Sequence, residues 1–155
     1  MKRIFVAICL LSCLFFPYSS AVSEENHFWE VDLDNGYIST KPVIVEEQVF
    51  VRTSGFWTGE DRPHVYAFDV NTGEEVWRFR NAKSTNHDMS PLLHVSAGSG
   101  TCGNWSEMML TAWTDGRVIA LDIDTGNPIW ESQTEVVTWG ITGSMALDGE
   151  NVVVP

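Results

Sequence analysis

Basic residues are scarce in this sequence. Nine Lys and Arg stand against 21 Asp and Glu over 155 residues, which gives a net charge of −12. Because phosphate binding needs clustered cations, this composition argues against a nucleic-acid-binding surface. It also disfavours an electrostatic anchor on anionic lipid. Hydrophobic residues make up 44% of the chain and charged residues 19%, so wholesale disorder is excluded and an acidic domain with a packed core is expected.

No apolar run has the length of an ordinary membrane span. The apolar segment 4–16 has 13 residues, whereas a spanning helix needs about 20. It follows Lys2 and Arg3 and leads to small residues that end at Ser23, the order typical of a secretory signal peptide. We therefore predict a signal peptide at 1–23 and a mature chain at 24–155 that is periplasmic, on the cell surface or extracellular. An uncleaved membrane anchor remains an alternative.

Cysteine is equally scarce. Removal of the signal peptide takes away Cys9 and Cys13 and leaves only Cys102, so the mature chain cannot form an intrachain disulfide. Cys102 could pair with another molecule, but we expect it to be partly buried in a loop. A lipid anchor on Cys13 also stays open because the small residue Ser12 precedes it, although the apolar residues 14–16 would be an unusual start for a lipidated chain.

Familiar catalytic and metal-binding patterns are absent from the sequence. There is no Gly-x-Ser-x-Gly elbow, no P-loop and no dinucleotide-binding glycine motif. The histidines that follow the signal peptide and its flanking residues lack the spacing of a metal site; they are His64, His87 and His94. The sequence therefore predicts no catalytic residue and no metal ligand.

One acidic stretch resembles the start of a calcium-binding loop. Asp122 and Asp124 have the right spacing, but the fifth and twelfth positions are Gly126 and Gln133, where an EF-hand needs an oxygen ligand and a Glu. We interpret this stretch as a structural turn, and residues 32–36 in the same way.

What the sequence does contain is an internal repeat. Residues 65–77 and 118–130 match at an offset of 53 and share the pattern Ala-x-Asp-x-x-Thr-Gly-x-x-x-Trp. Five fixed positions within eleven residues, present twice, indicate a repeat architecture. The positions that define it are Ala67, Asp69, Thr72, Gly73 and Trp77, and again Ala120, Asp122, Thr125, Gly126 and Trp130.

Each copy of the repeat reads as a β-hairpin. Residues 65–69 alternate with the period of a strand, and Gly73 supplies the positive φ that a tight turn needs. The Asp69 carboxylate can accept hydrogen bonds from the turn amides, and Thr72 can cap them. The tryptophan then falls at the far end of the second strand.

Further strand pairs surround these hairpins. Residues 42–51 and 145–154 each read as strand, turn and strand, with Asp148-Gly149 as the second turn. We predict blades at 42–79 and 91–131 and an incomplete blade at 144–155. The predicted fold class is all-β: four-stranded antiparallel blades of a β-propeller, with about two and a half blades present.

The repeat resembles the tryptophan-docking motif of quinoprotein-type, or pyrroloquinoline-quinone-like, β-propellers, and the resemblance covers about residues 28–154. It implies that Trp77 and Trp130 pack between adjacent blades. It also implies one of two functions: a scaffold such as the lipoprotein that assists outer-membrane β-barrel assembly, or a dehydrogenase dependent on pyrroloquinoline quinone and calcium. The motif defines the fold and does not distinguish the two.

We favour an exported, non-catalytic scaffold of the cell envelope that binds protein partners and has no evident cofactor. The alternative is the N-terminal part of a quinone-dependent alcohol or sugar dehydrogenase, but no adjacent cysteine pair of the kind found in many such enzymes is present. A closed propeller needs at least about four blades, and residues 28–30 read as a closing tryptophan strand with no blade before it. We therefore expect either an N-terminal piece of a longer protein or a short chain that assembles from several copies.

A glycine-rich insertion offers the best candidate binding loop. Residues 96–106 stand where the third blade spends only two residues, and loops carry function more often than strands do. Its glycines imply mobility, while Cys102 and Trp105 could dock it on a neighbour or a ligand. We predict a binding loop at Cys102, Asn104 and Trp105. Residues 56–62 form the comparable excursion of the first blade.

Overall fold

The structure is a computed structural model that describes residues 28–33, 37–38, 40–54, 63–84, 89–135 and 140–155. The ordered elements of these ranges are all β-strands. The predicted signal peptide at 1–23, the excursion at 56–62 and His87 lie outside the described residues. The thirteen strands are β1 Tyr37–Ile38, β2 Val43–Val45, β3 Gln48–Ser54, β4 His64–Asp69, β5 Glu75–Arg80, β6 Leu93–Val95, β7 Gly98–Gly100, β8 Gly103–Trp105, β9 Met108–Ala112, β10 Arg117–Asp122, β11 Pro128–Gln133, β12 Ala146–Asp148 and β13 Asn151–Val153.

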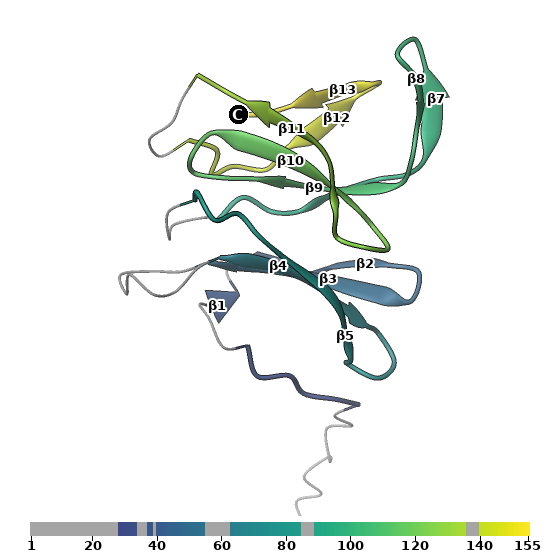
Figure 1. Ribbon diagram of the computed structural model, residues 1–155, viewed down its shortest axis with the longest axis vertical. Helices are drawn as coiled ribbons and strands as arrows, with labels where there is room; N and C mark the ends of the chain where they lie inside the picture. The colour runs from purple at the N-terminus through teal and green to yellow at the C-terminus, as the bar shows by residue number, and fades with distance from the viewer. Residues whose placement is uncertain (1–27, 34–36, 39, 55–62, 85–88, 136–139) are drawn as a thin grey trace, which may run out of the picture.

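The strands form two full blades and part of a third. In the first sheet β2, β3, β4 and β5 are antiparallel neighbours, and β1 continues the edge beside β3. The second sheet has the order β11-β10-β9-β6, and β12 and β13 form a two-stranded sheet of their own. Figure 1 shows the sheets stacked face to face. The predicted all-β fold of four-stranded antiparallel blades is confirmed.

Alternation along the strands explains why the blades stack. A strand sends successive side chains to opposite faces, so β9 places Met109 in the cluster with the first blade and Leu110 in the cluster with Met145 and Val152 of the third. The cluster between the first two blades also contains Phe50, Trp77 and Leu121. The two full blades therefore bury apolar side chains on both faces, as the central strand β10 shows by its nearly complete burial.

A buried arginine links the first two blades. Arg52 of β3 is 1% exposed. Its guanidinium donates a hydrogen bond to the Ser90 carbonyl over 2.6 Å and lies 4.5 Å from the centre of the Trp113 ring. This charge is therefore held at the blade interface by both a hydrogen bond and an aromatic face.

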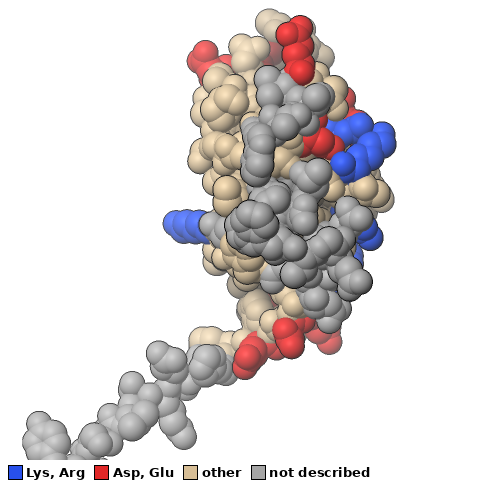
Figure 2. Space-filling model, turned by 90° about the vertical axis from the view of Figure 1, so that its left-hand side faces the viewer, with Lys and Arg blue, Asp and Glu red and all other residues tan. Residues whose placement is uncertain are grey.

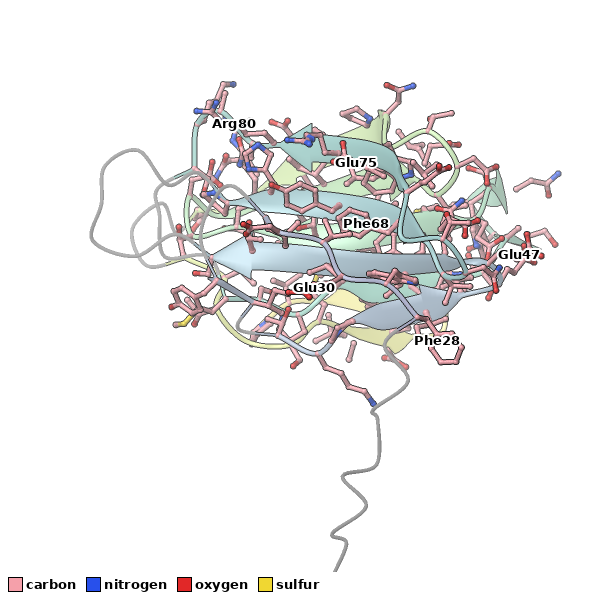
Figure 3. The ribbon with its side chains drawn as sticks, turned by 90° about the horizontal axis from the view of Figure 1, so that it is seen from below. Phe28, Glu30, Glu47, Phe68, Glu75 and Arg80 are labelled. Atoms are coloured by element: carbon pink, nitrogen blue, oxygen red, sulfur yellow. The ribbon has the colours of Figure 1, made fainter. Side chains whose placement is uncertain are left out.

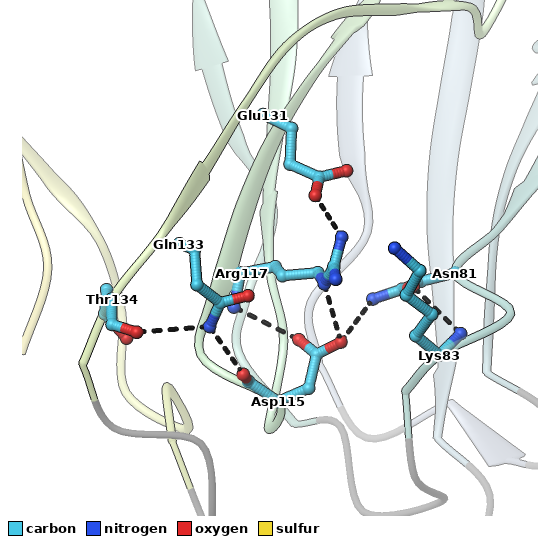
Figure 4. Close-up of polar contacts among 7 residues, drawn as sticks. All are labelled: Asn81, Lys83, Asp115, Arg117, Glu131, Gln133 and Thr134. Carbon is cyan, nitrogen blue, oxygen red and sulfur yellow. Dashed lines mark hydrogen bonds and ion pairs between the residues drawn. The ribbon is translucent and has the colours of Figure 1, made fainter.

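A surface polar network joins the same two blades (Figure 4). Asp115 lies in the turn between β9 and β10. Its carboxylate accepts a hydrogen bond from the Asn81 side chain of the first blade over 3.1 Å and forms an ion pair with Arg117 over 3.2 Å. Arg117 also pairs with Glu131 of β11. Gln133 donates to the Asp115 carbonyl over 2.8 Å. The network fixes the β9–β10 turn against the end of β5.

The residues that the sequence predicted to be a closing strand, 28–30, are not a strand. Regular pairing needs a hydrogen-bonded neighbouring strand, and none of the described strands pairs with them. The segment instead lays Trp29 and Leu33 across the outer face of the first blade, where Phe68 is buried. Phe28 is 89% exposed, and Figure 3 shows it pointing away from the sheet that carries Phe68.

Candidate functional site

The two repeated turns share hydrogen bonds from a threonine amide and hydroxyl to an aspartate carboxylate. In the first, the Asp69 carboxylate accepts from the amides of Asn71 and Thr72 over 2.9 and 2.8 Å, and from the Thr72 hydroxyl over 3.1 Å. In the second, Asp122 accepts from the Thr125 amide over 2.9 Å and its hydroxyl over 2.7 Å. These bonds stabilise the charged carboxylate, and the pKa of Asp69 is lowered, first by the Thr72 amide and then by the Asn71 amide.

Each turn receives a tryptophan from the preceding unit. Trp77 is 7% exposed, and its indole nitrogen donates to the Ile123 carbonyl over 2.9 Å, so that its ring covers Gly126 in the second turn. Trp29 does the same to the first turn: it donates to the Val70 carbonyl over 2.9 Å and covers Gly73. Ala67 pairs across the sheet with Trp77, and Ala120 pairs with Trp130. Both alanines are fully buried.

Trp130, the third tryptophan of this kind, is not received by the turn of a following unit among the described residues. Trp130 lies on β11, pairs with Ala120 across the sheet and is 36% exposed. All six residues of β11 are exposed, and Ile129 is 42% exposed. The sequence repeat thus yields one buried and one exposed tryptophan from the same motif.

The insertion at 96–106 is not an irregular loop. It contains the two-stranded hairpin β7–β8, in which Gly98 pairs with Trp105 and Ser99 with Asn104. The Trp105 indole nitrogen donates to the Ser96 carbonyl over 3.0 Å, which fixes the base of the hairpin. Local strand pairing therefore overrides the freedom that the glycines would give.

The three residues of the predicted binding loop, Cys102, Asn104 and Trp105, do not share the same surroundings. Cys102 is exposed at the hairpin tip, between β7 and β8, so the expectation of a partly buried thiol is wrong. Cys102 and Trp105 line a common cavity, whereas Asn104 is exposed on β8 and does not.

A carboxylate of the third blade fastens the hairpin tip. Glu150 accepts hydrogen bonds from the Thr101 amide at 3.0 and 2.9 Å and from the Thr101 hydroxyl at 2.8 Å. The Thr101 amide is the largest cause that lowers the pKa of Glu150, followed by the Thr101 hydroxyl, with a further contribution from the Cys102 amide. A Cβ at Gly100 would overlap this carboxylate, so the glycine allows the close approach. We call this contact the clasp.

The cavity beside the clasp has a volume of about 480 Å³. Apolar side chains from three elements line it: Trp105 of the hairpin, Leu110 and Trp130 of the second blade, and Val152 of the third. His94 also lines it and lies 2.6 Å from the Glu107 carboxylate. Two tryptophans and a polar rim give this cavity the character of a binding site.

A second cavity, of about 410 Å³, is acidic. It lies between the β2–β3 turn and the second blade and is lined by Val45, Glu46, Glu47, Gln48, Glu107, Ile123 and Asp124. Even so, no three His, Cys, Asp or Glu side chains of the described ranges come together as a metal site requires.

The sequence pointed to the hairpin but missed Glu150, His94 and Glu107 as parts of the site. A Glu directly after a Leu-Asp-Gly turn signal carries no mark of a contact with a residue 49 positions earlier. Only the adjacency of the two blades brings them together. No helix of the described ranges is long and apolar enough to cross a membrane.

Two kinds of relatives match the chain in sequence. The quinohemoprotein alcohol dehydrogenase ADH IIB of Pseudomonas putida is 29% identical over 126 residues, which cover 75% of this chain and 16% of that protein. The outer membrane protein assembly factor BamB of Burkholderia pseudomallei (strain K96243) is 33% identical over 98 residues, which cover 63% of this chain and 22% of that protein. The chain thus spans about a fifth of the length of these relatives.

Solved structures of the same two kinds show the fold. BamB from Moraxella catarrhalis superposes with a TM-score of 0.58 at 20% identity, covering 82% of this chain and 33% of that one. The quinohemoprotein alcohol dehydrogenase from Comamonas testosteroni gives a TM-score of 0.54 at 22% identity, covering 77% and 17%.

A family model settles which repeats these are. The model described as outer membrane protein assembly factor BamB matches residues 22–153, most of the chain. The chain therefore belongs to this family of pyrroloquinoline-quinone-like repeat proteins, and its sheets are blades of a β-propeller.

Proposed function

We propose that the chain is an exported, non-catalytic scaffold of the cell envelope that binds an extended segment of a partner protein along β11. The observation that carries this proposal is the exposed strand β11 with Trp130 beside an aromatic-lined cavity. The match to an outer membrane protein assembly factor supports a role in the envelope and a partner that is itself a protein.

Strand β11 offers the backbone groups for such binding. It lies at the end of the order β11-β10-β9-β6, so one side of it is paired with β10 and the other is an edge of the described sheet. An extended peptide can add to such an edge through main-chain hydrogen bonds, with alternate side chains entering pockets. The cavity lined by Trp130 and Trp105 provides a pocket for a large apolar side chain.

The negative charge around β11 favours basic residues in the rest of the bound segment. The chain has a net charge of −12, and Glu131, Asp148 and Glu150 all belong to β11 or to the adjoining β12–β13 hairpin. Figure 2 shows, on another face, acidic side chains gathered at both ends of the long axis. A partner segment that alternates apolar with basic residues fits this surface, because opposite charge speeds and orients the encounter.

Binding of a short synthetic peptide in which leucine and tyrosine alternate with threonine and lysine tests the proposal. Trp130→Ala should weaken its binding by about 10-fold or more, as expected for a central aromatic anchor. Phe28→Ala is the control, because Phe28 is also an exposed aromatic residue but lies at the other end of the molecule. Equal affinities of the Trp130→Ala variant and the unmodified protein would contradict the proposed site.

The dehydrogenase alternative has its own test. We expect no reduction of an artificial electron-acceptor dye when the exported protein is mixed with calcium, pyrroloquinoline quinone and a series of alcohols and sugars. Turnover in this assay would overturn the non-catalytic scaffold. The full-length gene product should be used, since the relatives with the name of such an enzyme are several times longer than this chain.

A further inference from the structure

We propose that the β7–β8 hairpin is a lid on the cavity, that the clasp between Thr101 and Glu150 holds it closed, and that release of Glu150 opens it. This inference rests on the proposed function only for the identity of what enters the cavity. The hairpin, the clasp and the cavity all lie in the described part of the chain.

The hairpin has the connections of a separate body. Strands β7 and β8 pair only with each other, and neither joins the ladder of the second blade in the described ranges. Within the hairpin, the Trp105 ring packs on Gly98, and its nitrogen bonds to the Ser96 carbonyl. The hairpin and Ser96 can therefore move as one piece about the chain links before Ser96 and after Trp105.

Its tip is fastened to a second separate body. Strands β12 and β13 also pair only with each other in the described ranges. In Figure 1 the tip of the β12–β13 hairpin points toward the β7–β8 hairpin. The hydrogen bonds between them converge on the single carboxylate of Glu150. The printed hydrogen bonds between the two hairpins thus depend on one side chain, while Trp105 and Val152 also pack against a common apolar cluster.

The lid forms part of the cavity wall. Cys102 and Trp105 come from the hairpin, whereas Met108, Leu110 and Trp130 come from the blade behind it. Movement of the hairpin away from Glu150 removes the first two and leaves the blade residues in place. The opened cavity then exposes the apolar floor to a partner segment.

A cation is the chemical signal that fits the clasp. Thr101 offers Glu150 an amide and a hydroxyl, both neutral donors, whereas a lysine ammonium adds the attraction between opposite charges. A lysine of the proposed partner segment can therefore replace Thr101 at this carboxylate. The other titratable groups around the cavity are His94 with its partner Glu107, Cys102 on the lid and Asp148 on β12.

Hydrogen exchange tests the clasp without any ligand. Glu150→Gln keeps the size of the side chain but removes its charge, and it should raise the exchange rates of amides in 98–105 and 146–153 by several-fold. Asp148→Asn is the matched control: it removes a carboxylate from the same hairpin and should leave these rates unchanged. Amides of β9 and β10 report whether each variant remains folded. Unchanged rates in Glu150→Gln would overturn the lid.

A reversible lock tests the opening. Glu150→Cys, made together with Cys9→Ser and Cys13→Ser, places a thiol where it can form a disulfide with Cys102 and hold the lid shut. The leucine–lysine peptide described above should bind the oxidised form at least about 10-fold more weakly than the form treated with reductant. Equal binding by both forms would show that the cavity is not entered through this lid.

The two proposals fail in different ways. If Glu150→Gln loosens both hairpins but no form of the protein binds the peptide, the lid stands and the proposed function fails. If the peptide binds and loses affinity with Trp130→Ala, but binds the locked and reduced forms equally, the function stands and the lid is overturned.

Discussion

Gly126 meets two demands at one residue. Its φ of 69° lies in the left-handed region, and a Cβ placed on it would come within 2.5 Å of the Trp77 ring. Gly73 has a φ of 73° and the same relation to Trp29. The repeat therefore keeps a glycine both for the turn and for the tryptophan that rests on it.

Replacement of Gly126, compared with replacement of Gly149, separates the effect of the turn conformation from that of the contact with Trp77. Gly149→Ala is the control, because Gly149 has a φ of 60° but nothing within 4 Å of an added Cβ; we expect it to lower the free energy of unfolding by about 1–2 kcal/mol. Gly126→Ala should cost more, because Trp77 must also shift. Chemical denaturation of both variants provides the measurement, and equal losses would contradict the docking geometry.

The same comparison applies to the tryptophans. Trp77→Ala removes a ring that is 7% exposed, and we expect a loss of about 3–5 kcal/mol in the free energy of unfolding. Trp130→Ala removes its repeat equivalent, which is 36% exposed, and should cost clearly less. A near-zero effect of Trp77→Ala in urea unfolding would mean that the blade interface is not where the repeat places it.

At the scale of single elements, the turn between β4 and β5 makes stability depend on pH. The folded pKa of Asp69 lies below its ordinary value of about 3.8, because of the Thr72 amide and then the Asn71 amide. A lowered folded pKa stabilises the protein above the unfolded pKa, and this stabilisation is lost as the pH falls through the folded pKa.

Unfolding measured between pH 7 and pH 2.5 checks this expectation. Asp69→Asn should weaken the fall in stability below about pH 4, since an amide does not titrate there. Asn127→Ala, a change at an exposed, non-titrating residue of the second turn, should leave the fall intact. The same pH dependence in Asp69→Asn and in the unmodified protein would refute the assignment.

Elements set by local chemistry could be predicted from the sequence, whereas contacts between elements could not. Asp69, Thr72 and Gly73 specify their turn within five residues, so the turn was readable from the chain. The clasp depends on residues 49 positions apart, and Trp29 and Val70 lie 41 positions apart. The glycine-rich segment misled for a related reason: its composition permits mobility, but pairing between β7 and β8 forms a hairpin.

At the scale of the whole molecule, the outer face of the first blade depends on the segment before β1. Trp29 lies on a face that contains Val49, Tyr66 and Phe68, with its ring centre 6.3 Å from that of Phe68. We expect Trp29→Ala to lower the free energy of unfolding by about 1–3 kcal/mol, less than for a fully buried tryptophan. Phe28→Ala, next to it and 89% exposed, should change little. Thermal unfolding of the two variants would contradict this role if they behaved alike.

The predicted export signal can also be checked on the whole molecule. Mass spectrometry of the protein recovered from outside the cytoplasm should find a mature chain that begins at Glu24. A lipid-modified peptide that starts at Cys13, or an intact Met1 terminus in the membrane fraction, would instead support one of the two alternatives left open by the sequence.

Tryptophan docking in this protein has a direction along the chain. Trp29 bonds to a carbonyl 41 residues ahead of it and Trp77 to one 46 residues ahead. Each ring is therefore synthesised before the turn that receives it. During export from the N-terminus onward, the tryptophan of one unit would stay exposed until the turn of the next unit emerged. The blades would thus pack against one another in the order in which they are translocated. A pause of the emerging chain between two units would leave one indole ring exposed to binding by chaperones.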